Sequence, residues 1–251
     1  CPHATRIIYA GFDKTGETLV TVSSDGMIGF TKNTGEEQIL RTTGSEKITT
    51  AQLSPDGTML ALGVATGQLH LAGVNERRFI EAPKILLNAA VKQIVFDDDG
   101  RDVAAIDQTG AIQVLDLQTR ESKTFNVPGA SGIDFSSNSE YLLIAGSVPD
   151  SKGLLTRIKI SVGTSEALFD AQGLTALWAG DSPDGQMIAA INANYELVVR
   201  KTTGEEVLNL AGPLNTILHA AFLSDGRTLV TSHPDRMCCW DLEQKRETVR
   251  L

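Results

Sequence analysis

The chain has 251 residues, of which 41% are hydrophobic and 21% are charged, and this balance excludes a disordered chain. Its longest uncharged apolar stretch covers only residues 217–223, whereas a membrane-spanning helix needs about 20 apolar residues. The net charge is −9 at pH 7 and the basic residues occur as scattered pairs, which argues against nucleic-acid binding.

The three cysteines are Cys1, Cys238 and Cys239, and the sequence contains no Asn-x-Ser/Thr site. An odd number with two adjacent members does not suit a disulfide framework, because neighbours on a strand point to opposite faces. We therefore expect a reducing compartment and a cytoplasmic protein. Because the chain starts at Cys1, the alternatives are a bacterial periplasmic lipoprotein with a processed N-terminus, or a domain of a longer protein.

An internal repeat runs through the whole chain. Six similar segments end in turns of the Ser-Pro-Asp-Gly type, and their anchor residues are spaced 42 residues apart on average. In chain order the anchors are Gly16, Gly57, Gly100, Ser139, Gly185 and Gly226. The repeats predict six units within a single domain of residues 1–251, at approximately 5–41, 46–82, 89–127, 130–170, 173–211 and 215–251.

Each unit is predicted to contain four strands. An apolar run leads into the Ser-Pro-Asp-Gly turn, whose Pro, Asp and Gly favour a tight hairpin, and a second short strand such as 58–64 follows. After a polar break, a third strand alternates apolar and other residues, as in 111–115. A second turn, seen in the nearly identical peptides 32–37 and 201–206, leads into the fourth strand. No segment keeps a helical period over ten residues.

Four strands repeated six times favour a β-propeller, because blades around an axis bury one another's faces. The chain resembles a divergent WD-repeat β-propeller in its period, its Ser-Pro-Asp-Gly turns and the segment Cys239-Trp240-Asp241-Leu242. It departs from that pattern in lacking the Gly-His pair that opens a unit, so the His–Asp–Trp hydrogen-bond network of the family is not implied. Asp25, Asp107 and Asp235 are candidate remnants of the turn aspartate. The fold class is therefore all-β, with six closed blades or an excerpt of a seven- or eight-bladed ring.

No catalytic, cofactor or metal site is predicted. The sequence has no phosphate-binding glycine loop and no nucleophile elbow. Asp97, Asp98 and Asp99 occupy the hairpin-turn slot and lack the spacing of a calcium loop. Cys238 and Cys239 are expected to be free structural thiols, and Trp240 to pack within its blade. The histidines lack metal-ligand spacing; they are His3, His70, His219 and His233.

The longest irregular insertion covers residues 147–153, between the second and third strands of the fourth unit. In a propeller such loops share one face with the connections between units, here 42–47, Tyr195 and 233–236. We expect interaction residues at Asp150, Lys152, Tyr195 and Arg236, and we take the turns at Asp56 and Asp99 to mark the opposite face.

The absence of recognisable chemistry, together with the resemblance, predicts a non-enzymatic scaffold that binds protein partners and needs no cofactor. One alternative is a propeller hydrolase with a metal in its central channel, which would need polar ligands on innermost strands, where we find mainly Gln52, Gln93 and Asp134. The other is a regulatory propeller fused to a catalytic domain outside this chain.

Overall fold

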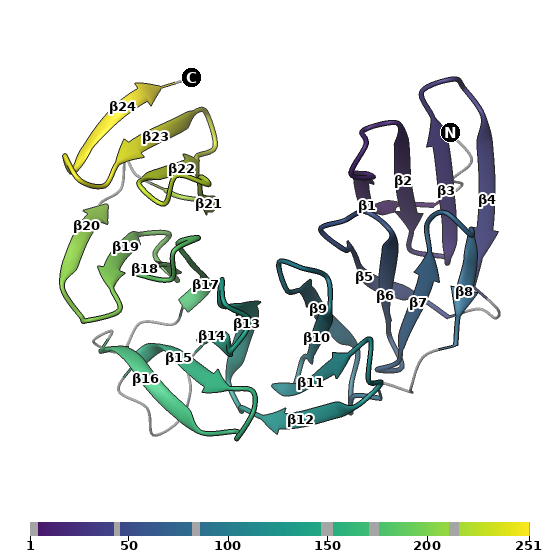
Figure 1. The fold of residues 1–251 in the computed structure, drawn as a ribbon, viewed down its shortest axis with the longest axis horizontal. Coiled ribbons are helices and arrows are strands. Elements are labelled where there is room, and N and C mark those ends of the chain that lie inside the picture. Colours follow the sequence, from purple (N-terminus) through teal and green to yellow (C-terminus); the bar gives the residue numbers. More distant parts are fainter. Residues whose placement is uncertain are drawn as a thin grey trace. The chain divides into compact units, whose positions relative to one another are not determined.

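The computed structural model describes residues 5–42, 46–81, 86–146, 153–170, 176–210 and 216–250. These residues form six four-stranded antiparallel sheets, each made of four strands in chain order (Figure 1). The strands of the first three sheets are β1 Ile7–Phe12, β2 Thr18–Ser23, β3 Met27–Lys32, β4 Glu37–Arg41, β5 Ile48–Leu53, β6 Met59–Val64, β7 Leu69–Gly73, β8 Arg78–Ile80, β9 Val91–Phe96, β10 Asp102–Asp107, β11 Ala111–Asp116 and β12 Ser122–Asn126. Those of the other three are β13 Ala130–Phe135, β14 Tyr141–Gly146, β15 Gly153–Lys159, β16 Ser165–Asp170, β17 Ala176–Asp181, β18 Met187–Asn192, β19 Leu197–Lys201, β20 Glu206–Leu210, β21 His219–Phe222, β22 Thr228–Ser232, β23 Met237–Asp241 and β24 Arg246–Arg250.

The repeated turn residues account for the first hairpin of each sheet. In the second sheet, Asp56 accepts hydrogen bonds from the Ser54 hydroxyl at 2.5 Å and from the Thr58 backbone nitrogen at 3.1 Å. Gly57 has a φ of +69°, which side chains rarely adopt. A Cβ there would also collide with the backbone nitrogen of Lys14, so the glycine lets this turn pack closely against the turn of the first sheet.

The second strand of each sheet lies deepest. In β6, β10, β14 and β18 every residue after the first is buried, because each of these strands pairs with a strand on both sides and its sheet packs against another sheet of the same unit. Apolar clusters join β1–β4 to β5–β8, and β5–β8 to β9–β12. Others join β13–β16 to β17–β20, and β17–β20 to β21–β24. The chain divides into two compact units, Cys1–Val127 and Pro128–Leu251, and each is described separately below.

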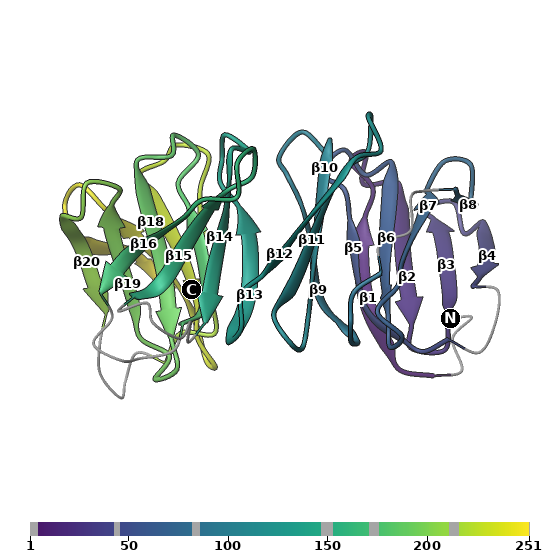
Figure 2. The same ribbon diagram turned by 90° about the horizontal axis from the view of Figure 1, so that it is seen from below.

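Within each unit the sheets have two distinct ends, which can be followed in Figure 2. One end, called the hairpin end here, carries the turns between first and second strands and between third and fourth strands. The other end, called the rim, carries the turns between second and third strands together with the links between sheets. At the rim, backbone nitrogens of the links donate to the turns: Thr42 to Gly26, Leu87 to Gly67 and Val127 to Gly110, at 2.8 to 3.0 Å.

The six predicted four-stranded antiparallel units and the all-β class are confirmed. The described residues contain no helix, and hence none long and apolar enough to cross a membrane. Cys238 is buried and Cys239 half-buried, and both thiols are free, as alternation along β23 predicts.

Candidate functional site: the rim of the second unit

Tyr195 occupies a strained backbone position in the turn between β18 and β19. Its φ is +61°, and the corresponding turns of the first three sheets have Gly26, Gly67 and Gly110 with φ from +85° to +87°. A left-handed conformation costs a residue with a side chain about 1 kcal/mol or more. A bulky aromatic residue therefore occupies a position that suits glycine better, and the residue is 44% exposed.

The turn that holds Tyr195 is rigidly braced. The Asn192 amide nitrogen donates to the Glu196 carboxylate at 2.9 Å, and the Asn192 amide oxygen accepts from the backbone nitrogens of Asn194 and Glu196. The Tyr195 carbonyl accepts from the Ile217 nitrogen at 3.0 Å. Because these bonds fix the turn, its backbone loses little further conformational entropy when a partner binds the tyrosine.

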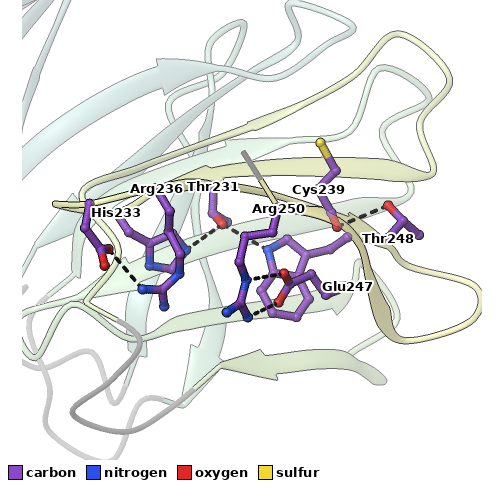
Figure 3. A network of polar contacts seen from close by, with 9 residues as sticks. Thr231, His233, Arg236, Cys239, Glu247, Thr248 and Arg250 are labelled. Atoms are coloured by element: carbon purple, nitrogen blue, oxygen red, sulfur yellow. Dashed lines mark hydrogen bonds and ion pairs between the residues drawn. The ribbon is translucent and has the colours of Figure 1, made fainter.

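The neighbouring rim turn, between β22 and β23, is held by hydrogen bonds that join the buried Thr231 and His233 to the half-buried Trp240 (Figure 3). The Trp240 indole nitrogen donates to the Thr231 hydroxyl at 2.9 Å, and that hydroxyl lies 3.0 Å from Nε2 of His233. A Thr–His–Trp network therefore exists without an opening Gly-His pair, because the histidine comes from the rim turn itself. Asp235 takes no part in it and instead pairs with Arg236 at 2.9 Å.

Burial, and secondarily the Arg236 guanidinium, lower the pKa of His233 below its ordinary value. A neutral imidazole can accept from or donate to the Thr231 hydroxyl, which suits its place in the chain of hydrogen bonds. Arg236 itself is only 21% exposed on its side chain. Most of the Arg236 side chain is therefore covered by the rim turn, which limits its motion.

At the outer edge of the same sheet, Arg250 and Glu247 form a two-bond ion pair, with distances of 2.7 and 2.8 Å (Figure 3). The hydrogen bonds from Arg250 hold the pKa of Glu247 below its usual range, and the pKa of Arg250 is raised in return. This part of the rim therefore offers fixed charges of both signs beside the Thr–His–Trp network.

Large apolar side chains are exposed at this rim. They are Leu177 at 41%, Tyr195 at 44%, Leu218 at 52% and Met237 at 47% exposure. The link that contains Leu218 ties the neighbouring turns together, because the Leu218 nitrogen donates to the Ser232 carbonyl and the Ile217 nitrogen to Tyr195. We call these four residues the rim patch. Patches of exposed apolar groups bordered by polar ones are typical of interaction sites.

Two of the four interaction residues predicted from the sequence lie in this region. Tyr195 and Arg236 stand at the same end of adjacent sheets of one unit, whereas Asp150 and Lys152 lie outside the described residues. Sequence reasoning missed Leu177, Leu218 and Met237. Leu218 lies in the apolar run 217–223 noted in the sequence, but exposure cannot be read from such a run.

The other candidate sites have structural roles. Asp97 is buried, and its carboxylate accepts from the Asp102 backbone nitrogen at 2.8 Å, as a turn residue does. His70 pairs with Glu46 at 2.9 Å in the first unit. Over the described parts of the chain, no three His, Cys, Asp or Glu side chains are grouped to hold a metal ion.

Comparison with solved structures supports the fold. No protein-family model and no curated protein sequence matches the chain. Many solved structures match, among them the β-propeller domain of Cps50 (Swd1) from Myceliophteria thermophila, with a TM-score of 0.71 and 14% identity. That match covers 99% of this chain and 87% of the other. The chain has the fold of a WD-repeat-like β-propeller, which confirms the resemblance at the level of fold.

Proposed function

We propose that the chain is a non-enzymatic recognition module that binds a protein partner through the rim patch of its second unit. The observation that carries this proposal is Tyr195. A tyrosine in a left-handed turn lowers stability relative to glycine, and strain of this kind is concentrated at functional sites. Tyrosine is also enriched among the residues that dominate binding energy at protein interfaces.

The neighbouring rim residues fit an interface of ordinary composition. Leu177, Leu218 and Met237 supply further exposed apolar area at the same end of the unit as the tyrosine, where Arg236 and the Glu247–Arg250 pair supply polar groups. Protein interfaces combine an apolar centre with a polar border in this way. The fold of the chain, which presents turns from a rigid scaffold of sheets, suits a binding role as well.

Replacing Tyr195 by asparagine should separate binding from stability. Asparagine accepts the left-handed conformation, so we expect the free energy of unfolding to stay within about 1 kcal/mol of the parent. Loss of an interface tyrosine costs roughly 2 kcal/mol of binding, which weakens partner capture by more than about tenfold. The measurement is quantitative pull-down from the source lysate, with urea unfolding as the stability check.

The matched control is Val162→Ser, at the hairpin end of the same unit, where the valine is 67% exposed. We expect V162S to capture the same partners as the parent. If Y195N binds every partner normally and V162S does not, the binding surface is at the hairpin end and the proposed function is placed on the wrong face. A second rim variant, Leu218→Ser, should behave as Y195N does.

A further inference from the structure

Within each unit the sheets pack on one another in one recurring way. Every sheet has a forward face, which packs on the sheet that follows it in the chain, and a backward face, which packs on the sheet before it. The contact between β17–β20 and β21–β24 illustrates both. There the forward face contributes Ala189, Val199 and Leu208, and the backward face contributes Ala220, Phe222 and Leu229.

The first sheet, β1–β4, has a largely exposed backward face (Figure 1). Its Phe12 is 64% exposed, whereas the residues at the same register position of the next two sheets, Leu53 and Phe96, are 6% and 9% exposed. Ala10 on the same face is also exposed, and Leu19, which is paired with Phe12, is half-buried. Apolar positions that are buried between sheets elsewhere in this unit are therefore open to solvent here.

The last sheet, β21–β24, has a largely exposed forward face. Val249 is 45% exposed, whereas Leu208, at the same register position of β17–β20, is 8% exposed. Cys239 is paired with both Val230 and Val249, and Cys239 and Val230 are half-buried. Met237, which also belongs to the rim patch, is 47% exposed at the edge of this face.

The two exposed faces match as the two halves of one sheet-to-sheet contact. The first and last sheets have the same residue types at three register positions of the backward face, namely Ala10 and Ala220, Phe12 and Phe222, and Leu19 and Leu229. In the last sheet these residues pack on the forward face of β17–β20. The forward face of β21–β24 has side chains of low polarity at the equivalent positions, and it therefore suits a sheet with the backward face of β1–β4.

We propose that the chain associates head to tail, with the forward face of β21–β24 in one copy packed on the backward face of β1–β4 in a second copy. Each chain offers both halves of this contact, so one kind of protein is sufficient. Removing the exposed apolar groups from water favours the association. Because the contact joins two different surfaces, association continues beyond two copies unless the assembly closes into a ring.

The test is sedimentation velocity of the whole chain over a wide range of micromolar concentrations. Phe12→Lys places a charge in the backward face, and Val249→Lys places one in the forward face. We expect the mass of the parent to rise with concentration beyond that of two chains. Each variant alone should stay monomeric, because it lacks one half of the contact and an unpaired charge buried there weakens association more than about tenfold.

An equimolar mixture of the two variants tests the head-to-tail arrangement. F12K keeps its forward face and V249K keeps its backward face, so the mixture should form heterodimers and nothing larger. The matched control is Val162→Lys, the same change at a valine that is 67% exposed and lies outside both faces. V162K should associate as the parent does.

A parent that stays monomeric at every concentration would overturn the proposal. If F12K and V249K also lowered the urea midpoint of that monomer while V162K did not, a sheet of the same chain would be the occupant instead. Association of the parent without heterodimers in the mixture would place the contact on other surfaces. Tyr195 and Leu218 lie outside both faces, so none of these outcomes bears on recognition at the rim patch.

Discussion

Replacing Thr231 by valine should lower the free energy of unfolding of the second unit by about 2–4 kcal/mol. The Thr231 hydroxyl is fully buried and contacts both the Trp240 indole nitrogen and Nε2 of His233 (Figure 3). Valine has nearly the same shape but leaves both partners without their hydrogen bond, and each buried group left unsatisfied costs about 1–3 kcal/mol. Urea unfolding followed by tryptophan fluorescence measures the loss, since both tryptophans, Trp178 and Trp240, belong to this unit.

The control is the same substitution at Thr248, on the adjacent strand β24. Its exposed hydroxyl donates one bond, to the Cys239 carbonyl at 3.2 Å, and water can replace it. T248V should therefore change the midpoint of unfolding very little. Equal effects of T231V and T248V would show that the Thr–His–Trp network does not support the fold.

Replacing Asp107 by asparagine should destabilise the first unit by roughly 3–5 kcal/mol. The carboxylate is fully buried, and its two oxygens accept five hydrogen bonds; the donors are the backbone nitrogens of Asn88, Ala89, Thr109 and Ala111 and the Thr109 hydroxyl. An amide would turn its nitrogen towards some of these donors, and broken buried networks of charged groups cost about this much. Hydrogen exchange of the amides in residues 86–111 reports the loss directly.

The same carboxylate should make stability depend on pH. Burial alone would raise its pKa, but the hydrogen bonds from Thr109, Ala111 and Ala89 outweigh it, so the pKa of Asp107 lies below its ordinary value. Its contribution is then fully present above the unfolded aspartate's pKa of about 3.9 and is lost as the pH falls through the lower folded value. Urea unfolding of D107N should lose less stability between neutral pH and pH 3 than the parent does.

Asp99→Asn supplies the comparison, because Asp99 is exposed in a hairpin turn of the same sheet. D99N should leave the exchange rates of residues 86–111 unchanged. A pH profile of D107N parallel to that of the parent would assign the acid sensitivity to other carboxylates.

The repeat in the sequence was sufficient to predict six four-stranded units. Turn chemistry is local: a Ser-Pro-Asp-Gly segment closes a hairpin by contacts within a few residues, so it can be recognised without knowing the partner sheets. The same reasoning placed Tyr195 and Arg236 in rim turns. Local pattern could not reveal that Tyr195 has a positive φ, since this follows from aligning its turn with Gly26, Gly67 and Gly110 in three dimensions.

Other features depend on which face of a strand packs against a neighbouring sheet, and only the tertiary structure shows these. No local pattern in the sequence shows that Arg157 and Asp181 line one pocket between the sheets β13–β16 and β17–β20, because a shift of one residue along a strand reverses every side chain's face. Likewise, the side chains of Thr231 on β22, His233 in the following turn and Trp240 on β23 meet only because the two strands pair. By itself the sequence determined the repeat, the strands and the turns, since these depend on neighbouring residues, whereas packing between sheets determined which side chains are buried and which are exposed.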